Sequence, residues 1–211
     1  MGQSVTIQDI ILGSTSKFRR ALLEACGVRF RVIASPADEN IIKSPDIRSL
    51  SLQRAEFKAQ SLAPLHPKSL IIGADQTLSF EGQGLEKASS RQEAFQNLKR
   101  LSGAVHYLHS SVCLITSVAG SAKTLGHVTC DVPMGMRELT EAEIEAYLDL
   151  GEWQGVVGCY QAENRGSQLF DPPMGDTSAI MGLPQADLLK LLRHIGINPL
   201  LNPSGPWELL V

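Results

Sequence analysis

The chain has 211 residues, of which 43% are hydrophobic and 19% charged, with a formal net charge of −3. This length and hydrophobic content allow a sizeable core, and the lack of a basic excess argues against a nucleic-acid polymer as partner. No apolar run approaches the ~18 residues of a membrane-spanning helix, and the polar stretch 1–9 lacks a signal-peptide pattern. Four widely spaced cysteines without a CxxC pair indicate reduced thiols and a cytoplasmic protein.

Residues 10–20 predict a strand, a tight turn and the start of a helix. Ile10 to Leu12 are typical of a buried strand, and the serines and threonine at 14–16 can cap the helix that follows. Unpaired N–H groups at such a helix start favour an anion such as phosphate, and Arg19 and Arg20 add cationic groups. An ordinary capped strand–helix unit with two solvated arginines would show the same pattern.

The next segment combines acids with a cationic helix. Alternation in residues 28–34 predicts a strand, and the turn-rich loop after it carries the adjacent acids Asp38 and Glu39. A helix is predicted at about 46–63, where residues 54 and 58, an arginine and a lysine, lie four apart and therefore share one face. Such a pair is also common on a solvated helix surface.

A carboxylate follows the most apolar strand of the chain. Leu70 to Ile72 are typical of a strand buried on both faces, which runs into Gly73-Ala74-Asp75-Gln76. Asp75 at the end of a core strand needs a partner, which can be a metal, a lysine or a hydrogen-bonded cap. Alternatively, Asp75 is a turn residue that bonds its own backbone.

The remaining segments predict alternating strands and helices. Histidines 106, 109 and 127 lack the spacing and the further ligands of a metal site. We expect a hairpin-like loop at 82–84 followed by Lys87, a helix at 90–101, and strands at 105–117 (broken near 109–111) and 123–132. A helix at 140–150 should begin with a Thr140–Glu143 capping box. After it we expect a strand and turn in the Gly-rich segment 155–166, a helix at 184–194, and a loosely packed tail after about 197.

Together these features suit the hydrolysis of a phosphoanhydride. Lysines and arginines neutralise a polyphosphate, while carboxylates hold a divalent metal or activate water. The chain lacks the GxxxxGK[ST], GxGxxG and GxSxG motifs of common nucleotide-binding and hydrolase folds. The residues alone therefore indicate a protein that binds a phosphorylated small molecule.

Several motifs then resemble the Maf family of nucleoside triphosphate pyrophosphatases. Residues 12–23 (LGSTSKFRRALL) are similar to its L-A-S-x-S-P-x-R-R-x-L-L motif. Five further segments match family motifs in the same order along the chain: Asp38-Glu39 matches D-E, Lys58-Ala59 matches K-A, Gly73-Ala74-Asp75-Gln76 matches G-[AS]-D-[TQ], Leu101-Ser102-Gly103 matches S-G, and Gly182-Leu183-Pro184 matches G-L-P. The resemblance therefore spans about residues 10–196. The departures are Lys17 and Ala88 in place of prolines, His109-Ser110-Ser111 in place of a Thr-Gly region, Arg165 in a Gly-rich turn and Asp176-Thr177-Ser178 in place of D-P-N.

The resemblance implies an α/β, Maf/ITPase-like fold: an elongated mixed central sheet flanked by helices, with two lobes around a cleft, in one domain over residues 1–211. It also implies cleavage of a nucleoside triphosphate to the monophosphate and pyrophosphate, dependent on Mg²⁺ or another divalent metal such as Mn²⁺, often in a homodimer. Asp75 would accept the proton, and Glu39 with Asp75 would hold the metal. The substrate-binding residues would be Ser14, Arg19, Arg20, Lys58 and Lys87.

The substrate branch depends on a few positions. Gln76 and Glu163 are similar to the 7-methyl-GTP branch of the family, whereas the dTTP/UTP branch has Thr and Gln there. A carboxylate at 163 can accept hydrogen bonds from a guanine edge, and Phe18 can stack on a cationic methylated base. The alternatives are dTTP/UTP or another modified nucleotide as substrate, or a non-catalytic nucleotide-binding regulator of cell division.

Overall fold

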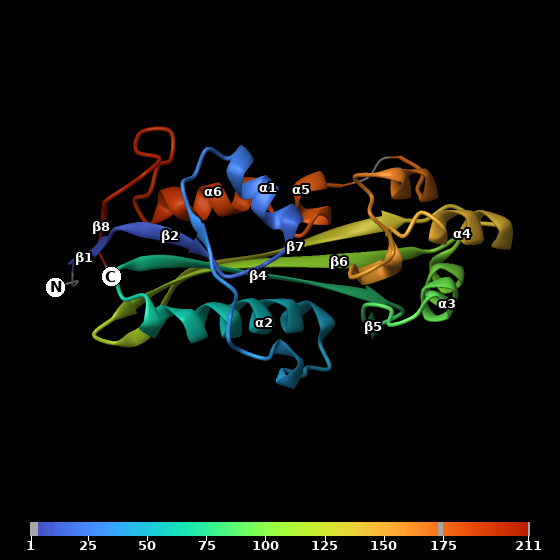
Figure 1. The fold of residues 1–211 in the computed structure, drawn as a ribbon, viewed down its shortest axis with the longest axis horizontal. Coiled ribbons are helices and arrows are strands. Elements are labelled where there is room, and N and C mark those ends of the chain that lie inside the picture. The colour runs from blue at the N-terminus through green and yellow to red at the C-terminus, as the bar shows by residue number, and fades with distance from the viewer. Residues whose placement is uncertain (1–3, 173–174, 211) are drawn as a thin grey trace.

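A computed structural model describes residues 4–172 and 175–210. These residues form a mixed sheet with the strand order β3-β2-β4-β6-β7, and β5 pairs with the far end of β4 (Figure 1). Strand β2 runs parallel to β3 and β4, and the other pairs of this sheet are antiparallel. The strands are β1 (Ser4–Ile7), β2 (Asp9–Leu12), β3 (Arg31–Val32), β4 (Ser69–Phe80), β5 (Gln83–Leu85), β6 (Val105–Val118), β7 (Ser121–Gly135) and β8 (Trp207–Leu210).

Helices cover both faces of the sheet, with α1 and α6 on one side and α2 on the other (Figure 1). Local capping explains where several of them begin: Ser16, Asp46, Ser90 and Thr140 each accept a backbone N–H of the first turn. The predicted capping box at Thr140 is confirmed. The helices are α1 (Lys17–Ala25), α2 (Ile47–Leu62), α3 (Arg91–Leu101), α4 (Glu141–Leu148), α5 (Thr177–Ile180) and α6 (Gln185–His194).

Burial of the central strands on both faces explains their apolar runs. On one face, Leu70 and Ile72 pack with Leu23 of α1 and with two leucines of α6. On the other face, Ile71 packs with alanines and a leucine of α2. A strand that buries alternate residues under different helices has no polar face, which is why its sequence reads as continuously hydrophobic.

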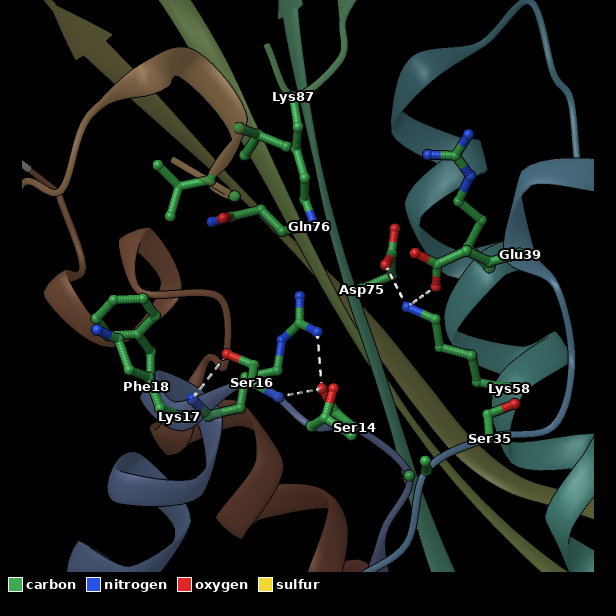
Figure 2. Close-up of a pocket in the computed structure, with 18 of the residues that line it drawn as sticks. Ser14, Ser16, Lys17, Phe18, Ser35, Glu39, Lys58, Asp75, Gln76 and Lys87 are labelled. Atoms are coloured by element: carbon green, nitrogen blue, oxygen red, sulfur yellow. Dashed lines mark hydrogen bonds and ion pairs between the residues drawn. The ribbon is translucent and has the colours of Figure 1, made fainter. Parts of the chain in front are cut away.

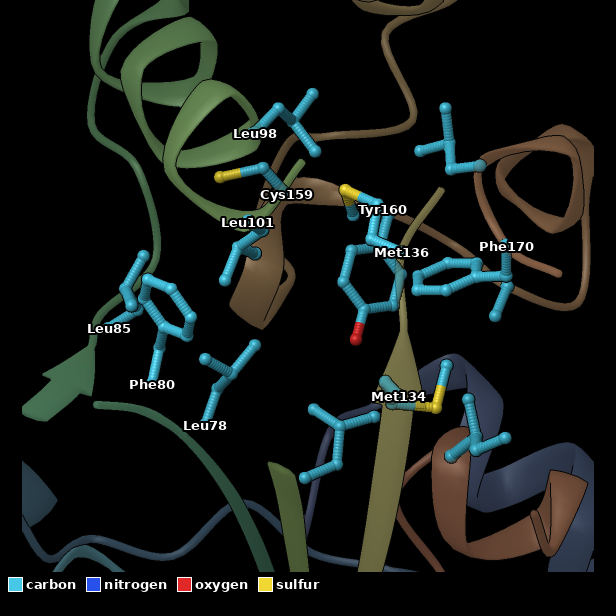
Figure 3. Packing of buried hydrophobic residues seen from close by; sticks show 14 of the residues in the cluster. Leu78, Phe80, Leu85, Leu98, Leu101, Met134, Met136, Cys159, Tyr160 and Phe170 are labelled. Carbon is cyan, nitrogen blue, oxygen red and sulfur yellow. The ribbon is translucent and has the colours of Figure 1, made fainter. Parts of the chain in front are cut away.

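A third hydrophobic cluster forms the other end of the molecule, around α3, α4 and the far ends of β4, β6 and β7 (Figure 3). Tyr160 and Phe170 meet edge to face there, with their ring centroids 4.8 Å apart. The same long strands run through all three clusters, so the sheet joins two lobes. One lobe contains the first two clusters, around α1, α2 and α6, and the other contains the third cluster, around α3 and α4. The predicted α/β fold with an elongated mixed sheet is confirmed.

Three predicted strands differ in the structure. In segment 28–34, only Arg31–Val32 pairs with the sheet. The break expected near 109–111 is wrong: β6 continues through it, because these residues pair with β4 on one side and β7 on the other. The Gly-rich segment contains the 3-10 helices Val157–Cys159 and Arg165–Leu169 instead of a strand, and Gly158 has a positive φ of 74° that a strand does not accommodate.

The two ends of the chain form a second, two-stranded sheet of β1 and β8. The expectation of a loosely packed tail holds for Leu200 and Leu201, which are exposed, but is wrong for Trp207 and Leu209, which are buried against the α1–α6 side of the core. Within residues 4–172 and 175–210, no helix combines the length and the hydrophobicity needed to cross a membrane.

Candidate active site

A cavity of about 920 Å³ lies between the two lobes (Figure 2). Its walls come from the β2–α1 loop, the loop around Glu39, one face of α2, the middle of β4, the residues after β5 and the segment 154–161. Of the described residues that line this cleft, six are lysine or arginine and three are aspartate or glutamate. The excess of cations favours a ligand with several negative charges.

Close packing of α2 on β4 brings an acid and a lysine together. A Cβ atom at Gly73 would lie 2.3 Å from the carbonyl oxygen of Ala55 and 2.8 Å from the Cβ of Ala59, so only glycine permits this approach. One turn along, the ammonium of Lys58 donates to Oδ1 of Asp75 at 2.7 Å. Both side chains are buried. The predicted need of Asp75 for a partner is thus met by a lysine.

Lys58 is shared between two carboxylates, since its ammonium also pairs with Glu39 (Figure 2). Burial lowers the pKa of Lys58, as do the positive charges of Arg19 and Lys87, while the charge of Asp75 raises it. The second oxygen of Asp75, Oδ2, is buried and has no hydrogen-bond partner among the described residues. It is therefore free to accept a proton or to bind a cation.

The β2–α1 loop holds an arginine rigidly against the cleft. Ser16 caps α1 by accepting the N–H of Arg19, and Oγ of Ser14 accepts both the Ser16 N–H and a guanidinium N–H of Arg19 at 3.1 Å. Nε of Arg19 donates to the carbonyl oxygen of Gly182 at 2.9 Å. Burial lowers the pKa of Arg19, and the charge of Asp75 opposes that shift. Lys17, in place of the family's proline, leaves the helix start intact.

Further predicted residues also line the cleft. The ammonium of Lys17 lies 4.8 Å from the centroid of the Phe18 ring, in a cation–π contact. The side-chain nitrogen of Gln76 donates to Ser110 Oγ and to the carbonyl oxygens of residues 179 and 180, so this amide ties β4 to β6 and α5. Lys87 reaches the cleft from the segment after β5.

Two predicted site residues do not line the cleft. Arg20 points to solvent, where it forms an ion pair with Glu24 on the same helix. Glu163 is half-buried outside the cavity lining, and burial raises its pKa. Gln161, two residues earlier, lines the cavity instead.

Sequence reasoning missed several other lining residues, among them Arg54, Glu86 and the segment 154–157. The spacing of Arg54 and Lys58 on one helix face was the signal for Arg54. Glu86 stands beside Lys87, which the family pattern had already singled out. In the segment 154–157, residues 155–157 have no polar side chain that would mark them.

The histidines and cysteines lie elsewhere. His106 is fully buried and bonds Tyr160, and its burial lowers its pKa to about 4. His109 stands between Ser79 and Asp131 on the sheet, outside the cleft lining. The four cysteines are unpaired thiols, two of them buried. Burial raises the pKa of each thiol.

The donors in the cleft fit a hard divalent cation. No group of three or more His, Cys, Asp or Glu residues gathers anywhere in the described part of the chain. Glu39 and Asp75 nevertheless converge on Lys58, and Asp75 has a spare oxygen. Mg²⁺ is commonly held by one or two carboxylates together with waters and substrate phosphates, and this pair has the chemistry of such a donor set.

The fold and the site together define an α/β protein with a cleft rich in lysine and arginine. The family model described as Maf-like protein matches residues 9–195. Curated relatives include the 7-methyl-GTP pyrophosphatase of Cupriavidus pinatubonensis, 34% identical over 92% of this chain and 96% of that protein. The nucleoside triphosphate pyrophosphatase of Rhodopseudomonas palustris (strain BisB18) is 38% identical over 89% of this chain and 94% of its own length. The 7-methyl-GTP pyrophosphatase of Bartonella quintana is 36% identical over 89% and 96%. The chain belongs to the Maf family.

Proposed function

We propose that this protein is a hydrolase that cleaves a nucleoside triphosphate to the nucleoside monophosphate and pyrophosphate. The observation that carries the proposal is the buried Asp75 carboxylate in a cleft rich in cations: one oxygen accepts from Lys58, and the other has no partner among the described residues. The names of the similar proteins describe the same activity.

In the proposed reaction, Oδ2 of Asp75 accepts the proton of a water that attacks the α-phosphate. Lys58 holds the carboxylate in place by donating to its Oδ1, and it stabilises phosphate charge during the reaction. Arg19, fixed by Ser14 and by the carbonyl of Gly182, positions a phosphate at the start of α1. Pyrophosphate leaves with the electrons of the broken P–O bond.

The metal is part of the proposal. Glu39 and Asp75 would hold Mg²⁺, or another divalent ion such as Mn²⁺, which when bound offsets phosphate charge and lowers the pKa of a water ligand. Both carboxylates contact Lys58, so they already lie near one another. The protein's own contribution is to hold these two acids close together.

We take 7-methyl-GTP as the substrate. Support comes from Phe18, whose ring already forms a cation–π contact with Lys17 and can contact the positively charged methylated base in the same way. Several similar proteins also carry that substrate in their names. The position of Glu163 outside the cavity lining removes its expected direct contact with the base, so dTTP, UTP or another modified nucleotide remains the alternative.

The test is pyrophosphate release from 7-methyl-GTP, GTP, UTP, dTTP, CTP and ATP with Mg²⁺, measured for the natural protein and for Asp75→Asn. We expect a preference for 7-methyl-GTP and a loss of turnover in Asp75→Asn by a factor of about 10² to 10⁴, the usual worth of a general base. The matched control is Asp149→Asn, since this exposed acid pairs with Arg91 away from the cleft.

Full activity of Asp75→Asn would contradict the assigned role of Asp75. Preference for another nucleotide would change the assigned substrate but not the assigned reaction. Micromolar nucleotide binding without any pyrophosphate release would instead support a non-catalytic regulator of cell division.

The location and assembly complete the proposal. We place the protein in the cytoplasm, because its four cysteines are all free thiols. We also propose a homodimer, which light scattering on the purified protein would test through the measured mass.

A further inference from the structure

Arg54 is a cleft residue to which the proposed reaction gives no role. It lies on α2, four residues before Lys58 and about 6 Å from it along the helix axis. Only 6% of the residue is exposed, yet it lines the cavity. Its Nε is buried and has no hydrogen-bond partner among the described residues.

Among the described residues, Arg54 forms one ion pair, and it is a weak one. Nη2 lies 3.2 Å from Oε1 of Glu86, whose side chain is 68% exposed. An ion pair with one partner in water contributes little to stability. A guanidinium has five N–H donors, and a buried cation is costly unless these donors are satisfied. Arg54 therefore faces the cleft as a desolvated cation with spare donors and a replaceable partner.

We propose that Arg54 binds a phosphate group of the nucleotide, and that Glu86 occupies its guanidinium until that phosphate displaces it. The inference rests on the proposed function and names a further substrate-binding residue. A phosphate offers two oxygens to the guanidinium fork, one more than Glu86 now offers. Since Arg54 lies one helical turn from Lys58 on the same face of α2, a polyphosphate bound at Lys58 can contact both cations.

The experiment measures the binding of inorganic tripolyphosphate, with Mg²⁺, by calorimetry. Arg54→Met keeps the buried stem of the side chain and removes the charge, and we expect it to weaken binding about tenfold or more, as for a lost charge-assisted hydrogen bond. Arg54→Lys restores the charge without the fork and should recover part of the loss. Glu86→Gln removes the competing carboxylate and should tighten binding by about two- to fivefold.

The matched control is Arg48→Met on the same helix. Arg48 pairs with Asp131 outside the cleft lining, so tripolyphosphate binding should not change. Thermal unfolding of each variant separates a loss of binding from a loss of folded protein.

Unchanged binding in a folded Arg54→Met variant would overturn the role of Arg54. Weaker binding in Arg54→Met with no gain in Glu86→Gln would overturn the displacement by phosphate. Because tripolyphosphate binding needs no turnover, these results stay separate from the proposed function, which fails only if no nucleotide of the panel is hydrolysed.

Discussion

Glycine at position 73 sets the distance between α2 and β4, and Gly73→Ala tests whether that distance matters. The added Cβ would lie 2.3 Å from the carbonyl oxygen of Ala55, 2.8 Å from Cβ of Ala59 and 2.8 Å from Sγ of Cys113. Ordinary contacts between such atoms begin near about 3.5 Å. Two of the three obstacles belong to α2, so this helix has to move away from the strand by roughly 1 Å.

The shift has a stability cost and a catalytic cost. Overpacking of a well-packed core costs about 1–3 kcal/mol of unfolding free energy. Each kcal/mol lowers the melting temperature of a chain of this size by about 2–4 °C. Because Lys58 is on the moving helix and Asp75 on the fixed strand, their contact is lost with the shift. A displacement of about 1 Å can reduce turnover about 10²-fold.

The assay compares the melting temperature and kcat of Gly73→Ala with those of Gly135→Ala. Gly135 is in β7, and a Cβ there would meet nothing within 4 Å, so this control should resemble the natural protein in both measurements. Natural stability and natural kcat in Gly73→Ala would refute the packing argument. Reduced stability with unchanged kcat would refute the link between helix position and the Lys58–Asp75 contact.

Two more predictions concern titration and the first helix. Buried His106 has a pKa of about 4, below its unfolded value of 6.5, so its contribution to stability is complete above pH 6.5 and is lost as the pH falls toward 4. The loss amounts to about 3 kcal/mol, measurable by denaturant titration from pH 7 to pH 4, and it should be absent from His106→Leu. Arg19→Ala should raise the KM for nucleotide at least tenfold, because it removes a cation from the cleft. Arg20→Ala should leave the steady-state kinetics unchanged, because Arg20 points to solvent. Equal effects of the two substitutions would contradict the placement of these side chains.

Sequence reasoning succeeded where the determinants are local. The capping box at Thr140 and the buried strand at Leu70 to Ile72 depend on residues within a few positions of one another. The partner of Asp75 could be reduced to a lysine, a metal or a cap from burial alone, because a carboxylate in a core strand cannot remain unpaired. Choosing the lysine required the packing of α2 on β4.

Sequence reasoning failed where the structure depends on the direction of a side chain or on the pairing of residues far apart in the chain. Arg19 and Arg20 look equivalent in sequence, but successive residues of a helix point about 100° apart, so only one of them faces the cleft. The strand at Trp207 forms because the two ends of the chain meet, which no local pattern records. Glu163 lies between two short 3-10 helices rather than in a strand, so its side-chain direction could not be inferred from alternation.

The ion pairs of the cleft suggest how an occupied site differs from an empty one. Both cations of these pairs, Arg54 and Lys58, belong to α2. Of the acids, Asp75 lies on β4, whereas Glu39 and Glu86 lie on short segments outside the long helices and strands. A polyphosphate that binds Arg54 and Lys58 would break their ion pairs with Glu86 and Glu39 and so release these two acids together. In the proposed mechanism, Glu39 is then free to hold a metal with Asp75, so the binding of phosphate to Lys58 completes the metal site beside it.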